Sequence, residues 1–251
     1  MNVWILQTGE PLHIDNGSLR PMRAINLSNK LSEAGHNVVI FSADFNHQQK
    51  YHRTNKYTAH KVNENIEIRL IPSIGYSKHI GIRRLIDHFQ LAWNLKKILK
   101  KEENIPDVAF IGYPPIETAS VMSKWLKAKK VPMLLDVKDL WPVVFVDSFP
   151  THLRPFAKVL FYVYYYLAKK TMKNASGIST MSEGFLKWTL AFSDRSESIS
   201  DKIVRLTSLT YYYTNEELKL AKKYWKSIGI ENQSPIVFFI GTFSTSFDFD
   251  K

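Results

Sequence analysis

Hydrophobic positions along the chain form two alternating patterns: short unbroken runs, and longer segments in which they recur every three or four residues. The short runs have the length of a buried strand, and the longer segments have the period of an amphipathic helix. The expected strands cover residues 3–6, 37–43, 66–73, 107–112, 132–137, 177–182, 202–208 and 236–240. The expected helices cover 24–34, 82–101, 116–129, 153–173, a short segment opened by Ser182, and 214–229.

Buried strands separated by amphipathic helices are typical of a parallel sheet that is covered on both faces. The pattern therefore predicts an α/β fold with a Rossmann-like, doubly wound parallel sheet over residues 1–230. After the helix stop at Gly229, the stretch "SPIVFFIGTFSTSFDFDK" offers a new strand and a glycine turn with no helix after it. We interpret residues 235–251 as the start of a second domain that is otherwise missing. The alternative is an ordinary last strand with a frayed tail.

The charge balance narrows the classes of partner. The chain has 34 Lys and Arg against 23 Asp and Glu, a net charge of +11, which favours an anionic partner such as a nucleic acid, a phospholipid surface or a phosphorylated ligand. It has no cysteine, so a disulfide framework and a thiolate metal site are excluded. The N-terminus has no basic leader before its short apolar run, and we expect a cytoplasmic protein.

In an open α/β sheet, ligands bind beyond the carboxyl ends of the strands. The loop after the first strand contains Gly17 and Ser18 and leads to Arg20 and Arg23 at the start of a helix, an arrangement that suits an anion. An ordinary strand-to-helix loop would carry similar residues. The stretch "GYPPIETA" places Tyr113 and Glu117 beside another helix start, where two prolines have a structural reading of their own.

The strand "PMLLDV" runs into Lys138, Asp139 and Trp-Pro. Because strand residues alternate between faces, Asp136 and Lys138 are expected to point the same way, with Asp139 where the strand leaves the sheet. A carboxylate beside a cation at this edge can hold a hydroxyl or act as a base. It can equally form a structural ion pair across a turn.

At this stretch the sequence resembles a known family. "DVKDLWP" is similar to the "DVRDLWP" segment of bacterial family 4 glycosyltransferases, retaining enzymes of the two-domain GT-B architecture that build capsule, O-antigen and related surface polysaccharides. Three further stretches agree in order: "NGSLRPMRAINLSNKLSEAGHNVVIFSA", "FIGYPPIETASVMSKWLKAKKVP" and "AKKTMKNASGISTMSEGF". "IVFFIGTFS" resembles the beginning of the family's second domain.

The resemblance implies a retaining hexosyltransferase that uses a nucleotide-sugar donor, a polyprenyl-linked or polysaccharide acceptor, and no metal or other cofactor. The N-terminal domain would hold the acceptor and approach the donor phosphate. The implied catalytic residues are Asp139, with Lys138 and Asp136 behind it, and the implied phosphate- or acceptor-binding residues are Gly17, Ser18, Arg20, Arg23, Tyr113 and Glu117. The family's Glu-x7-Glu donor motif is not present, so this chain alone is expected to be inactive or impaired.

Two helical segments combine basic and aromatic side chains. An enzyme with a lipid-linked acceptor would use such segments to bind the anionic inner face of the cytoplasmic membrane. The expected membrane-binding residues are Arg83, Arg84, Trp93, Lys96, Lys97, Lys169 and Lys170. A basic outer face over a buried apolar stripe would read the same way.

Two other functional classes remain open. A nucleic-acid-binding protein would also be basic and rich in aromatics, although the basic residues here lie on apolar helices and no nucleic acid is expected as a partner. A non-catalytic acceptor- or membrane-binding domain could act with a partner chain. The eight histidines have no metal-site spacing, and neither a GxSxG nor a Walker motif occurs.

Overall fold

The computed structural model describes residues 1–251 except 17–19, 79–80, 206–211, 231–234, 237–238 and 240–251. The described strands are β1 (Asn2–Leu6), β2 (Asn37–Ala43), β3 (Phe45–Asn46), β4 (Tyr51–His52), β5 (Thr58–Lys61), β6 (Ile66–Ile71), β7 (Val108–Tyr113), β8 (Met133–Val137), β9 (Gly177–Thr180) and β10 (Lys202–Ile203). The described helices are α1 (Arg23–Glu33), α2 (Ile82–Lys100), α3 (Ile116–Ala128), α4 (Val143–Asp147), α5 (Arg154–Leu160), α6 (Tyr162–Asn174), α7 (Glu183–Ser193) and α8 (Asn215–Ser227), with a 3-10 turn at Thr151–Leu153.

The main sheet has the strand order β10-β9-β8-β7-β1-β2-β6-β5. Neighbouring strands run parallel except for β5, which pairs antiparallel with β6 at the edge. The Rossmann-like α/β prediction is confirmed, with this antiparallel edge strand added. Because the order reverses direction at β1, the carboxyl ends of β1 and β7 flank the crevice where such sheets bind ligands.

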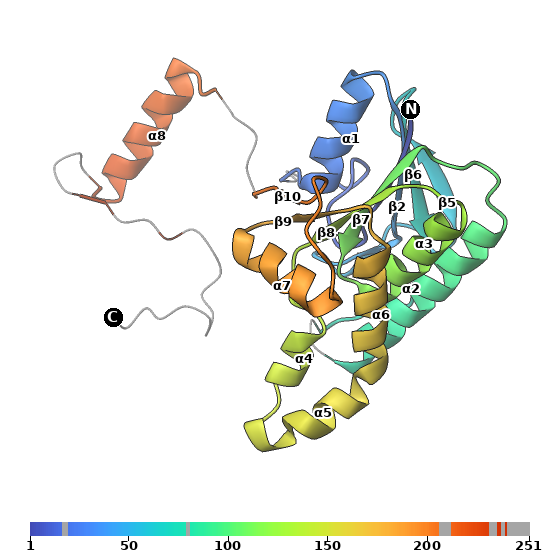
Figure 1. The fold of residues 1–251 in the computed structure, drawn as a ribbon. Coiled ribbons are helices and arrows are strands. Elements are labelled where there is room, and N and C mark those ends of the chain that lie inside the picture. Colours follow the sequence, from blue (N-terminus) through green and yellow to red (C-terminus); the bar gives the residue numbers. More distant parts are fainter. Residues whose placement is uncertain (17–19, 79–80, 206–211, 231–234, 237–238, 240–251) are drawn as a thin grey trace. The chain divides into compact units, whose positions relative to one another are not determined.

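Two hydrophobic cores cover the two faces of the sheet (Figure 1). Trp4 and Leu6 point into the core that α2, α3 and α6 share, while Ile5 between them points into the core on the α1 side. This alternation is the period of two that a strand imposes on its side chains. A sheet buried on both faces explains why the strands are apolar throughout.

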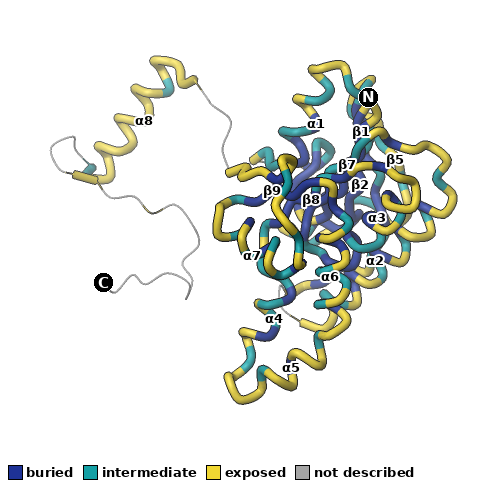
Figure 2. The backbone as a smooth tube through the Cα atoms, in the orientation of Figure 1, coloured by how far each residue is buried: buried dark blue, intermediate teal, exposed yellow. Residues whose placement is uncertain are grey.

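The helical stretch expected at residues 153–173 is divided in the structure. The helix α5 ends at Leu160, Phe161 lies between, and α6 begins at Tyr162. Most of α5 is exposed, whereas α6 packs on α3 and α7 through its buried residues (Figure 2). None of the helices in the described ranges combines the length and the apolar composition that crossing a bilayer requires.

Contacts divide the chain into two compact units, residues 1–206 and 207–251. In the second unit the structure describes α8, which begins with a capping box formed by Thr214 and Glu217, as the sequence predicts. The boundaries 1–230 and 235–251 remain a prediction. Much of the predicted strand at 236–240 lies outside the described residues.

Candidate functional site

A cavity of about 210 Å³ opens at the carboxyl ends of the strands, as the doubly wound topology predicts. Its walls come from the ends of β1, β2, β7 and β8 and from the first half of α2. The polar side chains that line it are Gln7, Thr8, Glu10, His47, Tyr76, Arg84, Asp87, His88, Lys138 and Asp139. Both signs of charge therefore meet in one concave site.

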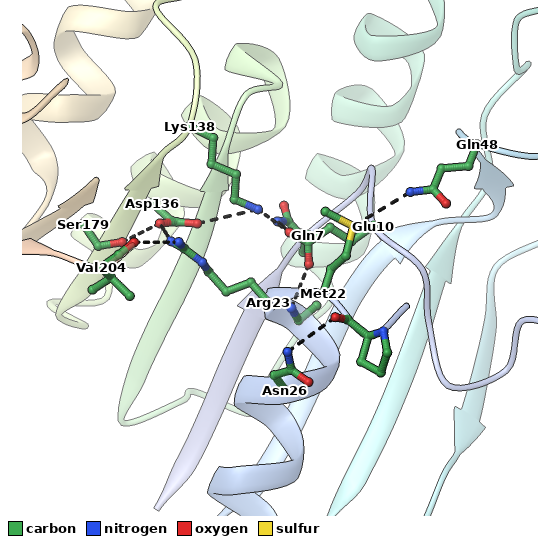
Figure 3. Close-up of polar contacts among 12 residues, drawn as sticks. Gln7, Glu10, Met22, Arg23, Asn26, Gln48, Asp136, Lys138, Ser179 and Val204 are labelled. Carbon is green, nitrogen blue, oxygen red and sulfur yellow. Dashed lines mark hydrogen bonds and ion pairs between the residues drawn. The ribbon is translucent and has the colours of Figure 1, made fainter. Parts of the chain in front are cut away.

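Beside the cavity, a chain of charged groups joins the loop after β1 to the end of β8 (Figure 3). The Lys138 ammonium pairs with Glu10 and lies 3.7 Å from an oxygen of Asp136, and Asp136 pairs in turn with Arg23. The prediction that Asp136 and Lys138 share a face agrees with this geometry. Lys138 is the member of the chain that also lines the cavity.

Asp136 is fully buried, and its contacts are internal. It accepts hydrogen bonds from Arg23 and from the Ser179 hydroxyl at the end of β9. Burial raises the pKa of Asp136, while Lys138, Ser179 and Arg23 oppose the rise because they favour the carboxylate. Asp136 therefore links three segments of the chain and is not a wall of the cavity.

Glu10 was not singled out by the sequence, yet it connects the loop after β1 with α1. It accepts a hydrogen bond from the Gln7 side chain at 2.6 Å and another from the Ala24 backbone N–H at 2.8 Å. The residue before α1, Met22, supplies no side-chain cap, so Glu10 satisfies one of the free N–H groups of the helix from outside. A carboxylate at a helix N-terminus is also favoured by the helix dipole.

Asp139 lies at the rim of the cavity with an exposed side chain. The surrounding protein displaces part of its water and raises its pKa, an effect that the positive charges of Arg84 and Lys138 oppose. Of the three predicted catalytic residues, Asp139 and Lys138 reach the cavity. They offer an acceptor and a donor of hydrogen bonds to the same bound molecule.

Behind the cavity wall formed by α2 lies a second polar group. His88 of α2 lines the cavity, and its Nδ1 lies 3.7 Å from Oε2 of Glu117 in the first turn of α3. Tyr164 of α6 donates a hydrogen bond of 2.8 Å to Oε1 of Glu117. Burial raises the pKa of Glu117 to about 7, and burial, together with the charges of Arg84 and His47, lowers the pKa of His88 to about 3.

Aromatic rings and cations form one side of the cavity. The Arg84 guanidinium lies 5.7 Å from the ring centre of Tyr76 and 5.2 Å from that of Trp141. The Lys50 ammonium lies 4.6 Å from the Tyr76 ring, and His47 hydrogen-bonds the Tyr76 hydroxyl. Such cation–π contacts hold positive charge beside an aromatic surface, a combination that suits a sugar bearing a phosphate.

The other predicted phosphate- or acceptor-binding residues are placed differently. Gly17 and Ser18 lie outside the described residues, and Arg20 is exposed. Arg23 contacts Asp136 and the Val204 carbonyl. Tyr113 is fully buried and donates a hydrogen bond to the Trp141 carbonyl at 2.7 Å, and Glu117 is buried against His88 and Tyr164.

The predicted membrane-binding residues lie mostly on the outer surface of α2 and α6. Trp93 is 59% exposed, and Lys96 and Lys97 lie 5.8 and 5.6 Å from its ring centre. Arg83 and Lys170 are exposed, and Lys169 pairs with Asp194. Arg84 differs from the rest of this set because it lines the cavity.

Within the described residues, no group of three or more His, Cys, Asp or Glu side chains could hold a metal ion. The charged groups at the cavity instead pair with one another, as in the contacts of Glu10 with Lys138 and of Asp136 with Arg23.

No protein-family model matches the sequence, and no curated protein matches it. Among solved structures, sucrose-phosphate synthase from Thermosynechococcus elongatus aligns with a TM-score of 0.51 at 10% identity, over 91% of this chain and 100% of that one. The catalytic domain of starch synthase IV from Arabidopsis thaliana, bound to ADP and acarbose, aligns with a TM-score of 0.52 at 12% identity, over 93% of this chain and 60% of that one.

The chain has a GT-B glycosyltransferase fold. At identities of 10 and 12% the likeness concerns the Rossmann-like architecture. The chain spans 60% of the length of the starch synthase domain. In such folds the crevice at the carboxyl ends of the strands is the place for a ligand, and this is where the cavity with Lys138 and Asp139 lies.

Proposed function

We propose that the protein is a glycosyltransferase of bacterial surface-polysaccharide synthesis, and that this chain supplies its acceptor side. It would transfer a sugar from a nucleotide-sugar to a polyprenyl-linked or polysaccharide acceptor. The observation that carries the proposal is the convergence of Lys138, Asp139 and His88 on one cavity at the carboxyl ends of the strands. The aligned starch synthase domain binds ADP and acarbose, a nucleotide and a sugar analogue, within the same fold class.

In this proposal Asp139 orients the acceptor, and Lys138 balances negative charge that develops on the departing diphosphate. The similarity of "DVKDLWP" to the family 4 segment supports a retaining reaction without a metal. Residues 235–251 would begin the donor-binding domain, and the nucleotide contacts would come from that domain. Positioning the two substrates, which converts an encounter into an intramolecular step, would supply much of the rate.

The direct test is sugar transfer by the protein expressed at its natural length. A panel of UDP-, GDP- and ADP-linked hexoses would be offered with polyprenyl diphosphate sugars, and the labelled lipid product would be separated and counted. We expect one donor to give product and Asp139→Asn to abolish it, while Glu33→Gln, an exposed control on α1, leaves it unchanged. If no donor gives product and the protein shifts RNA or DNA at physiological salt, the nucleic-acid alternative replaces this one.

We further propose that the protein binds the inner face of the cytoplasmic membrane peripherally. The observation in favour is the exposed apolar surface of α5 and the start of α6, where Phe156, Val159 and Tyr162 are 67, 73 and 68% exposed. A cavity of about 380 Å³ lined by Lys127, Lys169, Lys170 and Lys173 lies between α3 and α6. Apolar side chains beside lysines suit an interface with anionic lipid.

A further inference from the structure

The pair formed by His88 and Glu117 has a feature that packing does not explain. Nδ1 of His88 and Oε2 of Glu117 are both buried, and neither has a hydrogen-bond partner among the described residues, although they lie 3.7 Å apart. The two side chains are 4 and 2% exposed. Buried polar atoms without partners are uncommon in folded proteins and ask for a functional reason.

The surroundings determine which atoms of the pair are available. Tyr164 occupies Oε1 of Glu117, so Oε2 is the oxygen directed at His88. The His88 ring lines the cavity, and because Nδ1 is turned toward Glu117, Nε2 lies on the other side of the ring. Trp141 and Tyr76 flank the ring at centroid distances of 6.0 and 6.2 Å.

The proton positions in this pair follow from its electrostatics. The titratable and charged groups around it are Arg84, Asp87, His47, Tyr76, Tyr113 and Tyr164. Burial and the positive charges of Arg84 and His47 keep His88 neutral, since its pKa is lowered to about 3. Burial raises the pKa of Glu117 to about 7, so this carboxyl changes its charge near neutral pH.

The charge of Glu117 selects the tautomer of His88. An ionised Glu117 accepts a hydrogen bond from Nδ1–H, which leaves the Nε2 lone pair free to accept a proton from a bound molecule. A protonated Glu117 donates to Nδ1 and forces the hydrogen of the ring onto Nε2. A carboxylate that orients a histidine in this way is a recurring device of proton-transfer sites.

We propose that His88 accepts the proton of the attacking acceptor hydroxyl and that Glu117 is the residue that positions His88 for this step. The inference rests on the proposed glycosyl transfer. The O–H bond of the acceptor breaks and its proton moves to Nε2, while the acceptor oxygen bonds to the anomeric carbon of the donor. The bond from that carbon to the donor diphosphate breaks, and its electron pair leaves with the nucleoside diphosphate. The family resemblance would assign the proton to the diphosphate instead.

Kinetics of the natural-length protein test the assignment. We expect His88→Gln to lower kcat by about 10²- to 10⁴-fold with little change in KM, the usual range for loss of a general base. In the wild type, kcat/KM should rise with pH to a plateau with a midpoint near 7, because ionised Glu117 provides the active tautomer. Glu117→Gln should lower kcat and lose this limb, and Glu117→Asp should restore part of both.

Tyr164→Phe is the matched control, since it removes the hydrogen bond to Oε1 and leaves the His88 contact at Oε2. It should keep the limb and move its midpoint to higher pH, because the Tyr164 hydroxyl lowers the pKa of Glu117. If transfer occurs and the Glu117→Gln profile superimposes on that of the wild type, the inference is wrong while the proposed function stands.

A second measurement does not depend on activity. Long-range ¹H–¹⁵N spectra of the full chain, with the His88 signals assigned by comparison with His88→Gln, report the tautomer directly. We expect the proton on Nδ1 above pH 7 and on Nε2 below it, with no change across this range in Glu117→Gln. A single tautomer from pH 6 to 8 in the wild type would overturn the inference. A tautomer switch in a protein that transfers no sugar would instead count against the proposed function.

Discussion

Arg23, the first residue of α1, donates a hydrogen bond to Asp136, which lies 113 residues further along the chain near the end of β8 (Figure 3). The same guanidinium donates to the Val204 carbonyl at 2.9 Å, just after β10. One side chain therefore joins the carboxyl ends of β8 and β10 to the start of α1. The contact fixes the position of the helix whose first turn Glu10 also holds.

This contact predicts that Asp136 contributes mainly to stability. Removing one member of a buried ion pair costs about 3–5 kcal/mol, because the other charge remains buried without its partner. We expect Asp136→Ala to lower the free energy of unfolding in urea by about this amount. Glu33→Ala, which breaks the exposed Lys30–Glu33 pair, should cost less than about 1 kcal/mol. Equal losses in the two variants would show that Asp136 is not such a link.

Asp139 should behave in the opposite way. Its side chain is exposed at the cavity rim, so Asp139→Asn is expected to change the free energy of unfolding by no more than about 0.5 kcal/mol. If the carboxylate orients the acceptor, kcat should fall by roughly 10²-fold or more. Parallel urea melts and transfer assays measure both quantities on one preparation. Unchanged turnover would remove Asp139 from the site.

The fold could be predicted because its signal is local. The alternation of Trp4, Ile5 and Leu6 between two cores and the apolar period of α1 are visible in any short window of the sequence. The break at Phe161 was missed, since the apolar period continues across it. The edge strand β5 was missed too, because its buried and exposed residues are few.

The site could be predicted only where strand ends determine it. Lys138 and Asp139 follow a buried strand directly, and the topology alone brings them to the crevice. Glu10 has partners 14 and 128 residues away, and nothing near it in the sequence marks them. His88 lies in a helix that reads as a basic and aromatic surface, and only the fold shows that Glu117 stands behind it.

The stability of the protein should depend on pH through Glu117. Because its pKa is about 7 in the folded state against an ordinary 4.5, the folded state holds a proton that the unfolded chain releases in this range. The stabilisation is complete below pH 4.5 and is lost as the pH rises through 7. At about 1.36 kcal/mol for each pKa unit, the loss is at most about 3 kcal/mol.

Glu117→Gln isolates this contribution, since His88, with its lowered pKa, stabilises above pH 6.5 and remains in both proteins. The difference in unfolding free energy between the variant and the wild type should move in favour of the variant by up to about 3 kcal/mol between pH 4.5 and 7.5. Urea melts at these two pH values measure it. Glu33→Gln should show no such trend, and a trend of the same size there would assign the effect to general surface charge.

The exposed apolar side chains of α5 and α6 predict binding to anionic vesicles. Phe156, Val159 and Tyr162 would enter the lipid interface while nearby lysines meet the headgroups. Since each fully buried apolar side chain contributes roughly 1.5–3 kcal/mol, the combined change of all three to Ser should weaken co-sedimentation at least tenfold. Ile199→Ser is the control, because Ile199 is 90% exposed outside this surface. Lysine contacts contribute about 1 kcal/mol each near such a membrane, so binding should also fall with added salt. Equal sedimentation with neutral and anionic vesicles at low salt would contradict the proposal.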